Sequence, residues 1–338
     1  MILLLAALIS APITFAKDPN YCLDVQNGTA ANGTAVRLYK CNGSSAQNWN
    51  TSTVVSAPVS TPALAPITVS SSLSNLVDPN TPPKAGYNVA FSDEFNGARL
   101  DLTKWNLVTD GSGGGNNELQ YYLPFPSTNF LSNGQLTIRV TKQGFLGQQY
   151  TSAKLTTAGI FDFTYGWIEA RIKVPQGQGF WPAFWTMPKD SLYGQWPTSG
   201  EIDIMEILGG APNQLYGTLH YGPAWPNQKQ IGGQKTATPG TDYSQDFHVY
   251  AADWQTDHID FYVDGVKYFT VNSADIADWQ TDNQGAVKST GSNGWPFNIP
   301  HYVIFNMAMG GQWPGAPNPA LTQGDMVVDY VRVYQKSP

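Results

Sequence analysis

Charged residues are scarce in this chain. They make up 13% of its 338 residues, against about 25% in an ordinary globular protein. Lys and Arg number only 18, against 25 Asp and Glu, which argues against a nucleic-acid partner because such a partner requires a basic surface. The chain also lacks a zinc-type His/Cys cluster, a GxSxG nucleophile motif and a phosphate-binding loop. We therefore expect no cofactor in catalysis.

Long apolar runs and cysteines are equally rare. The run MILLLAALISAPITFA at residues 1–16 ends in small residues and is too short and too Pro-interrupted for a membrane span. It is typical of a secretory signal peptide, although no Lys or Arg precedes it. We expect a secreted, extracellular protein that does not bind membranes. In an exported chain the only two cysteines, Cys22 and Cys41, are expected to form a disulfide; two free thiols are the alternative.

The rest of the chain divides into a linker and a region rich in β-strand patterns. Residues 51–86 are dominated by Ser, Thr, Pro and Ala and predict an extended linker. Residues 87–338 show no sustained helical periodicity. Short alternating or wholly apolar runs, bounded by turn residues, predict strands at 135–140, 166–174, 201–208, 248–254, 258–265, 301–309 and 327–335. Many short strands over roughly 250 residues indicate an all-β sandwich or jelly roll.

Aromatic residues are abundant where charge is scarce. They reach 13% of the chain and include 11 Trp. Indole and phenol rings on a weakly charged protein suit neutral ligands with flat apolar faces, such as sugars. The alternative is that these rings fill a large β core, and this alternative accounts for about half of them.

Three acids lie close together in GEIDIMEILGG, residues 200–210. Side chains alternate in a regular strand, so Glu201 and Asp203 share one face and Glu206 lies on the other. An extra residue at Ile204–Met205, a β-bulge, would turn Glu206 to the side of the other two. Without a bulge, Glu206 would be ionised against the core at a cost of several kcal/mol. An edge strand with both faces in water is the third possibility, and the apolar residues of the motif disfavour it.

A bulge would make this motif suitable for glycoside hydrolysis. Glu201 and Glu206 would lie about 13 Å apart between Cα atoms, at about 3.3 Å per residue. On a twisted, concave sheet their side chains can approach the ~5–5.5 Å carboxyl separation of a retaining glycosidase. Asp203, between them, would hold the nucleophile by a hydrogen bond and keep the two glutamate pKa values apart. From the spacing alone, an acidic solvated face or a cation site is an equal alternative.

The motif and its surroundings resemble the laminarinase-like branch of the family 16 glycoside hydrolases. The resemblance covers about residues 87–336. It is carried by FSDEFNG (91–97), GGGNNELQYY (113–122), YTSAKLTT (150–157), GWIEARIKVPQGQGFWPAFWTMP (166–188), GQWPTSGEIDIMEILGG (194–210), YGTLHYG (216–222), FHVYAADW (247–254), MAMGGQWPG (307–315) and VDYVRVYQ (328–335).

The resemblance implies a concanavalin A-like β-jelly-roll of two antiparallel sheets with a concave substrate cleft. It makes Glu201 the nucleophile, Glu206 the general acid/base and Asp203 their assistant. The ExDxxE form is similar to that of laminarinases, so the implied activity is endo-hydrolysis of β-1,3-glucan with retention, with mixed-linkage 1,3-1,4 glucan as a second substrate. A non-catalytic β-glucan recognition protein and a transglycosylase on the same fold are the alternatives.

The same resemblance implies a set of substrate-binding residues. Trp181 and Trp185, four residues apart on one expected strand face, would stack on sugar rings; core packing is the alternative. His220 would hydrogen-bond Glu206 or a sugar hydroxyl, or else have a structural role. Asn116 would bind sugar at the cleft rim, unless its glycine-rich surroundings are only a turn. Trp313 would form a distal subsite. Lys154 replaces the usual arginine and lacks its planar fork of donors.

Two further features follow from resemblance alone. Family members hold a structural Ca²⁺ at positions that match Glu94, Gly134 and Asp329, where oxygen ligands would tie distant segments together. Residues 17–50 resemble one repeat of a ricin-B-type carbohydrate-binding module, which needs three repeats for its complete fold. We expect a monomer whose partner is a β-glucan polysaccharide or oligosaccharide.

Overall fold

The computed structural model describes residues 82–276 and 294–337 with their side chains. Before residue 82 it describes only five strands, as backbone. The chain forms two compact units, Met1–Ser74 and Asn75–Pro338. The division lies within the predicted linker at 51–86, and the predicted boundaries themselves stay predictions. In the described part of the chain, no helix has the length and apolar character needed to cross a membrane.

The first unit contains two small antiparallel sheets. In one, β1 (Ala11–Pro12) pairs with β5 (Asn48–Trp49). In the other, β3 (Asp18–Val25) lies between β2 (Thr14–Phe15) and β4 (Val36–Lys40). The side chains of this unit, those of Cys22 and Cys41 among them, lie outside the described residues. The predicted disulfide, signal peptide and ricin-B-type repeat therefore stay predictions.

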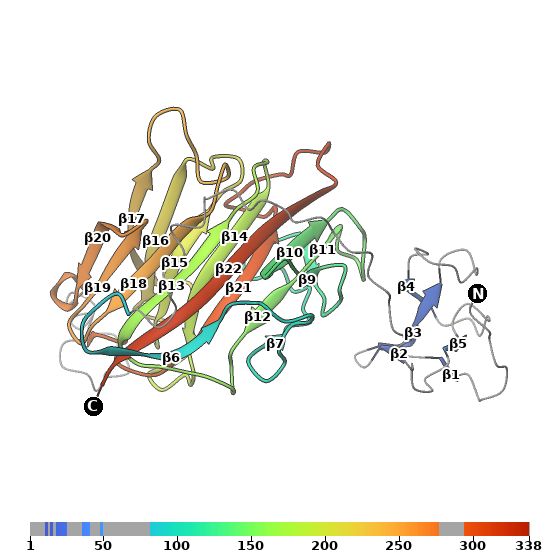
Figure 1. Cartoon of the computed structure of the whole chain (residues 1–338). Helices are drawn as coiled ribbons and strands as arrows, with labels where there is room; N and C mark the ends of the chain where they lie inside the picture. The colour runs from blue at the N-terminus through green and yellow to red at the C-terminus, as the bar shows by residue number, and fades with distance from the viewer. Residues whose placement is uncertain are drawn as a thin grey trace, which may run out of the picture. The chain divides into compact units, whose positions relative to one another are not determined.

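The second unit is built from two large sheets (Figure 1). The seven-stranded sheet runs in the order β17 (Lys229–Thr236), β16 (Gln214–Tyr221), β15 (Glu201–Ile207), β14 (Phe180–Pro188), β21 (His301–Met309), β12 (Lys154–Thr156) and β7 (Asn106–Leu107). The path of the ten-stranded sheet is β20 (Val266–Asn272), β19 (His258–Val263), β18 (His248–Trp254), β13 (Gly166–Lys173), β22 (Gln323–Lys336), β10 (Gln135–Thr141), β11 (Tyr150–Ser152) and β8 (Gln120–Tyr122). In addition, β6 (Tyr87–Asp93) pairs with β22 and β9 (Asn129–Ser132) with β10.

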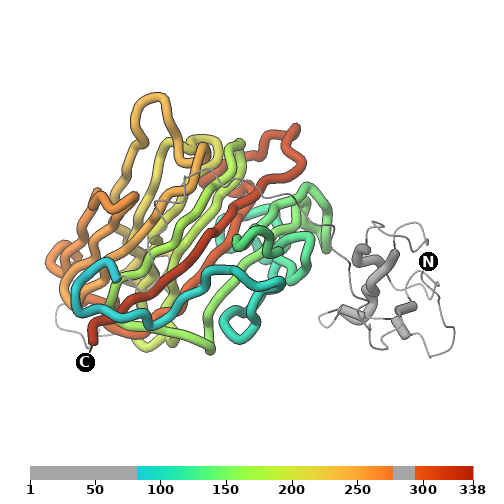
Figure 2. Tube along the Cα trace, in the orientation of Figure 1, coloured from blue at the N-terminus to red at the C-terminus, as the bar shows by residue number. Residues whose placement is uncertain are grey.

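The two ends of this unit lie side by side. Strand β6, at its start, pairs antiparallel with β22, at its end, as the tube in Figure 2 also shows. The seven predicted strands are all present, with bounds that differ by at most a few residues. The all-β prediction is therefore confirmed. The pattern succeeds because alternating side chains face either the packed core or the outer surface of a sheet.

The main core lies between the two sheets. Ile168, Ile172 and Val333 of the ten-stranded sheet and Phe184 and Ile207 of the seven-stranded sheet are almost fully buried in one cluster. Each such side chain contributes roughly 1.5–3 kcal/mol through burial. The acids of β15 lie on the opposite face of their sheet, because the apolar residues of the same strand occupy the core side. We call this opposite face the acid-bearing face.

The alternation predicted for the last strand is only partly regular. Val328, Val331 and Val333 all lie in the main core. In a regular strand Val328 and Val331, three positions apart, would face opposite sides of the sheet. The register between β13 and β22 shifts at Arg171/Ile172, so β22 carries an extra residue there and its alternation changes phase. Tyr334 is also buried, in a second small cluster with Trp167 and Ala251. The final strand therefore buries both faces near its end.

Candidate active site

A β-bulge in β15 brings the three acids together. Asp203 pairs with Trp185 and Met205 with the preceding residue Phe184, so Ile204 is the extra residue in the ladder with β14. The ladder with β16 shifts register in the same interval. Ile202, Ile204, Met205 and Ile207 all belong to the core cluster. The predicted bulge is confirmed: two successive residues face the core, and Glu206 turns to the acid-bearing face.

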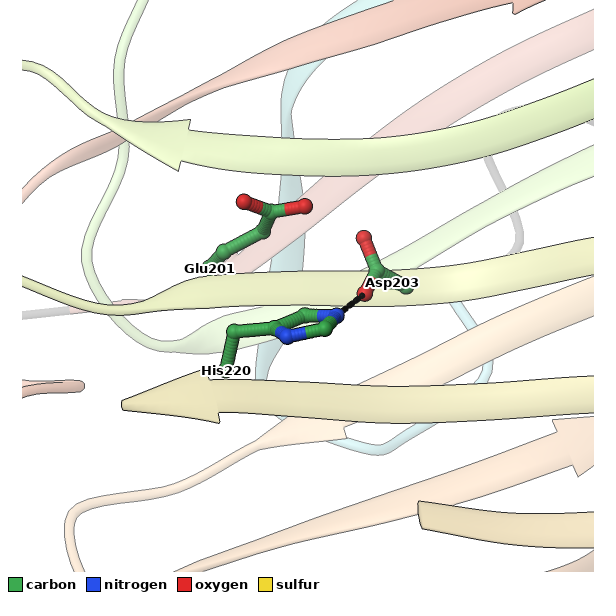
Figure 3. A group of neighbouring side chains, drawn as sticks. All are labelled: Glu201, Asp203 and His220. Carbon is green, nitrogen blue, oxygen red and sulfur yellow. Dashed lines mark ion pairs between the residues drawn. The ribbon is translucent and has the colours of Figure 1, made fainter. Parts of the chain in front are cut away.

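Glu201 and Asp203 lie beside His220 (Figure 3). Residue His220 is the cross-strand partner of Glu201 on β16, and its Nε2 lies 3.1 Å from Asp203 Oδ2. The sequence predicted that His220 would hydrogen-bond Glu206 or a sugar hydroxyl, or have a structural role. In the structure its partner is Asp203, and the contact with sugar stays a prediction. The register between the strands accounts for the contact with Asp203. His220 lies opposite Glu201, whereas Glu206 pairs with Tyr216, four residues from His220 along β16.

Each glutamate accepts a hydrogen bond from an indole. Trp181 Nε1 donates to Glu206 Oε1 at 3.1 Å, and Trp196 Nε1 donates to Glu201 Oε2. Trp196 was not predicted as a site residue, although it precedes Glu201 by only five positions in GQWPTSGEID. Proximity in sequence to the acid motif was the signal that could have identified it. Both donors restrict the rotation of a carboxyl group that burial has partly removed from water.

Burial changes the proton affinity of all three acids. It raises the pKa of Glu201 to about 8, with the nearby charge of Asp203 as the second cause and a hydrogen bond to Asp203 as a further one. Burial is also the largest cause of the raised pKa values of Asp203 and Glu206. The charge of His220 acts in the opposite direction on both glutamates. The three acids therefore share protons near neutral pH instead of carrying three charges.

The two tryptophans of β14 lie on the acid-bearing face. Trp181, which donates to Glu206, also packs edge-to-face on Trp313 with 5.1 Å between ring centroids. Trp185 Nε1 donates to Asn306 Oδ1 at 2.6 Å. Neither ring belongs to the core clusters. The position predicted for both tryptophans is confirmed, and their role in stacking on sugars stays a prediction.

Trp313 and Asn116 belong to two loops that touch each other. Gln312 N donates to the carbonyl oxygen of Asn116 at 2.8 Å, which joins the glycine-rich loop at 113–117 to the loop that carries Trp313. Trp313 is 39% exposed, and its ring centroid lies 5.1 Å from that of Tyr216. These contacts place Asn116 next to the aromatic cluster of Trp181, Tyr216 and Trp313. Tyr216 was not predicted from the sequence.

Lys154 lies on the other side of β14, on β12. Its Nζ is 4.6 Å from the ring centroid of Trp185, a distance at which a cation is attracted to an indole face. Burial lowers the pKa of Lys154, whereas the charges of Glu201, Glu118 and Asp110 oppose that change. The structure thus places the predicted substrate-binding lysine within electrostatic reach of Glu201.

The three positions predicted to bind calcium have other partners. Arg332 donates to both carboxylate oxygens of Glu94 at 2.8 Å, and Arg171 pairs with Asp329 at 2.8 Å. Gly134 lies in the turn between β9 and β10, with φ of +72°. A cation at these positions would depend on backbone carbonyl oxygens, because each carboxylate is already paired with an arginine. The calcium site stays a prediction.

Among the described residues, two groups of side chains could offer three metal ligands. One is the trio Glu201, Asp203 and His220 itself. The other, Asp253, His258 and Asp260, lies on β18 and β19, where Lys84 pairs with Asp253 and Lys267 with Asp260 at 3.2 Å. The negative charges of the two aspartates in the second group are thus already neutralised by lysine ammonium groups.

A pair of glutamates on one face of a β-sandwich, with an aspartate between them, is the arrangement of a glycoside hydrolase. A model of the glycosyl hydrolases family 16 matches residues 117–332, and the chain belongs to this family. It is 37% identical over 275 residues to glucan endo-1,3-beta-glucosidase A1 of Niallia circulans; the match covers 76% of this chain and 39% of that protein.

Solved structures of the same family are also similar. The laminarinase from Rhodothermus marinus has a TM-score of 0.65 and 35% identity, over 75% of this chain and 98% of that one. A non-specific endo-beta-1,3(4)-glucanase has a TM-score of 0.64 and 36% identity, over 77% of this chain and 95% of that one.

Proposed function

We propose that this protein hydrolyses internal β-1,3-glucosidic bonds of β-glucans with retention of anomeric configuration, and cleaves mixed-linkage 1,3-1,4 glucan as a second substrate. The bulge in β15 is the observation that carries the proposal, because it places Glu206 on the same face as Glu201 and Asp203. The similarity to an endo-1,3-beta-glucosidase and to a non-specific endo-beta-1,3(4)-glucanase supports the choice of substrates.

The first half of the proposed reaction forms a covalent intermediate. The Glu201 carboxylate attacks the anomeric carbon while the glycosidic carbon–oxygen bond breaks. Glu206, kept protonated by its raised pKa, transfers its proton to the departing oxygen. Glu201 must be ionised to attack, so the proton that it shares with Asp203 has to lie on Asp203 in this step, although the pKa of Glu201 is the higher of the two. The hydrogen bond from the indole of Trp196 favours the ionised form of Glu201.

The second half regenerates the enzyme. Glu206, now ionised, takes a proton from water, and the water oxygen attacks the anomeric carbon as its bond to Glu201 breaks. Two inversions leave the product with the configuration of the substrate. A sugar hydroxyl in place of water would give transglycosylation, since the first half is common to both reactions.

Several properties of the whole chain are proposed on the sequence alone. They are secretion after removal of residues 1–16, extracellular action as a monomer, a ricin-B-type repeat at residues 17–50, and a structural calcium ion. Amino-terminal sequencing of the protein secreted from an expressing cell tests the first. A mature chain that still begins at Met1 would contradict it.

Hydrolysis assays test the main proposal. Wild type should release short oligosaccharides from laminarin and less from lichenan. Glu201→Ala and Glu206→Ala should each lower kcat by on the order of 10⁴-fold or more, because each removes a group that acts on the reacting bond. Activity confined to agarose or carrageenan would refute the substrate, and near-wild-type activity of either variant would refute its role. A wild type that binds laminarin without cleaving it would support the recognition protein instead.

A further inference from the structure

Glu118 is a buried acid that the proposed mechanism does not use. Its side chain is 7% exposed and lies beneath the glycine-rich loop at 113–117. A Cβ atom at Gly114, where φ is +56°, would lie 2.3 Å from Glu118 Oε1. Only glycine therefore lets this loop close over the carboxyl group, and the loop excludes water from one side of it.

Hydrogen-bond donors converge on the Glu118 carboxyl group. Gln120 Nε2 donates to Glu118 Oε2 at 2.6 Å. The backbone N–H of Met309 donates to Gln120 Oε1 at 2.8 Å, which fixes the orientation of that amide. Burial raises the pKa of Glu118, whereas the hydroxyl of Tyr122 lowers it. Two neighbouring side chains of β8 thus satisfy a carboxylate that burial would otherwise destabilise.

A relay of side chains joins Glu118 to the acid-bearing face. Trp185 Nε1 donates to Asn306 Oδ1 at 2.6 Å, and Asn306 Nδ2 donates to Tyr122 Oη at 3.0 Å. Because the Tyr122 oxygen accepts that bond, its own proton is available for Glu118. The two bonds of the series therefore run from Trp185 to Tyr122, and they leave the hydroxyl proton of Tyr122 for Glu118. Both Asn306 and Tyr122 are less than 10% exposed, so water competes little for these bonds.

Glu118 also acts on the cation that covers Trp185. The ammonium group of Lys154 lies 4.6 Å from the Trp185 ring centroid and is attracted by both Glu201 and Glu118. Asp110 adds a third negative charge nearby. Glu118 can thus influence Trp185 and Lys154 in two ways. Hydrogen bonds orient the indole of Trp185, and the negative charge of Glu118 attracts the ammonium group of Lys154.

We propose that Glu118 is a positioning residue for the substrate: through Tyr122, Asn306 and Lys154 it holds Trp185 and the ammonium group in the arrangement that binds the sugar next to Glu201. The inference rests on the proposed function, since it assumes that glucan lies on this face. Glu118 itself touches no reacting atom, so its loss should weaken substrate binding more than it slows bond cleavage.

Five variants test this role on laminarin. Glu118→Gln keeps the shape of the side chain but removes its charge and one acceptor, and Tyr122→Phe interrupts the relay while leaving the charge. Glu169→Gln is the matched control, since Glu169 is also buried and accepts an indole hydrogen bond, from Trp167 at 2.8 Å, on the other sheet. Lys154→Met, alone and combined with Glu118→Gln, tests whether the two residues act together.

We expect Glu118→Gln to raise KM about tenfold with a smaller change in kcat, the effect of losing one charge-assisted contact. Tyr122→Phe should raise KM by a smaller factor, and Glu169→Gln should lower Tm without changing KM. The KM of the double variant should not exceed the KM of whichever single variant binds laminarin more weakly. An unchanged KM in Tyr122→Phe, or effects of Glu118→Gln and Lys154→Met that multiply, would overturn the inference. If Glu118→Gln does not fold, Tyr122→Phe decides.

The wild type separates this inference from the proposed function. If wild type cleaves no β-glucan, the proposed function fails and the inference fails with it. If wild type cleaves laminarin and Glu118→Gln behaves like Glu169→Gln, only the positioning role of Glu118 is refuted.

Discussion

At the residue scale, tryptophan has two separate uses in this protein. Trp105, Trp167, Trp254 and Trp295 are buried, with at most 8% of each exposed. Trp181 and Trp196 instead donate to Glu206 and Glu201, and Trp185 and Trp313 lie on the same side of the sheet. An indole combines a flat apolar face with one N–H donor. It can therefore hold a carboxylate and still offer its face to a sugar ring.

Asp203 is the residue whose charge most directly controls the two glutamates. Its negative charge raises the pKa values of both Glu201 and Glu206. In Asp203→Asn that charge is absent, so Glu206 should lose its proton at lower pH. We expect the alkaline limb of the kcat/KM profile to move to lower pH and kcat to fall.

The pH dependence of laminarin hydrolysis measures this effect. His220→Gln is the comparison with the opposite sign, because the charge of His220 lowers both glutamate pKa values. Its alkaline limb should move to higher pH. Identical profiles for wild type and Asp203→Asn would show that Asp203 does not tune the acids.

At the element scale, the bulge in β15 decides which way its acids face. One extra residue, Ile204, changes the phase of the strand between Asp203 and Glu206. Removing Ile204 would give Glu-Ile-Asp-Met-Glu, in which strict alternation places all three acids on one face without a bulge. Removing Ile202 instead would make Glu201 and Asp203 adjacent in sequence, and strict alternation would then turn one of them into the core.

Deletion of Ile204 should therefore be tolerated better than deletion of Ile202. We expect the Ile204 deletion to fold and to keep activity, reduced on the order of 10²-fold because the spacing of the glutamates changes. The Ile202 deletion should lower Tm and abolish activity, because it buries an unpaired carboxylate. Hydrolysis of laminarin and lichenan, with thermal unfolding of both variants, tests this. Equal behaviour of the two deletions would contradict it.

The elements that the sequence predicted are those whose side chains alternate clearly. EIDIMEIL predicts a strand, and the misplaced Glu206 also predicts its bulge, because a buried ionised carboxylate is too costly to retain. The relay from Trp185 to Glu118 could not be predicted in this way. Its members lie on β14, β21 and β8, and no local pattern tells which strands of two sheets become neighbours. The contact of His220 with Asp203 could not be predicted for the same reason, because it depends on the register between β15 and β16.

At the scale of the whole molecule, the buried acids of β15 lower the free energy of unfolding. Burial raises the pKa of Glu201 from 4.5 to about 8. Between these values the folded state binds more protons than the unfolded state, so its stability falls as pH rises. The core between the two sheets must compensate for this cost. With Glu201 the protein is therefore less stable at alkaline pH than it would be with a neutral side chain at the same position.

Glu201→Gln should consequently stabilise the protein in alkaline solution. We expect its Tm at pH 8 to exceed that of wild type by roughly 5 °C, with a smaller difference at pH 5, where wild-type Glu201 is protonated in the fold. Thermal unfolding of both proteins across this range measures the difference. A Tm difference that does not grow with pH would contradict the raised pKa of Glu201.

The most direct test of the account is to identify the residue that bonds covalently to the sugar. A laminaribiosyl fluoride with fluorine at the 2-position of the reacting sugar should form the intermediate quickly and release it slowly. Peptide mapping by mass spectrometry should then find the added sugar on Glu201, with Glu206 and Asp203 unmodified. Modification of Glu206 or Asp203 instead, or turnover with inversion and no covalent adduct, would contradict the assignment of Glu201 as nucleophile.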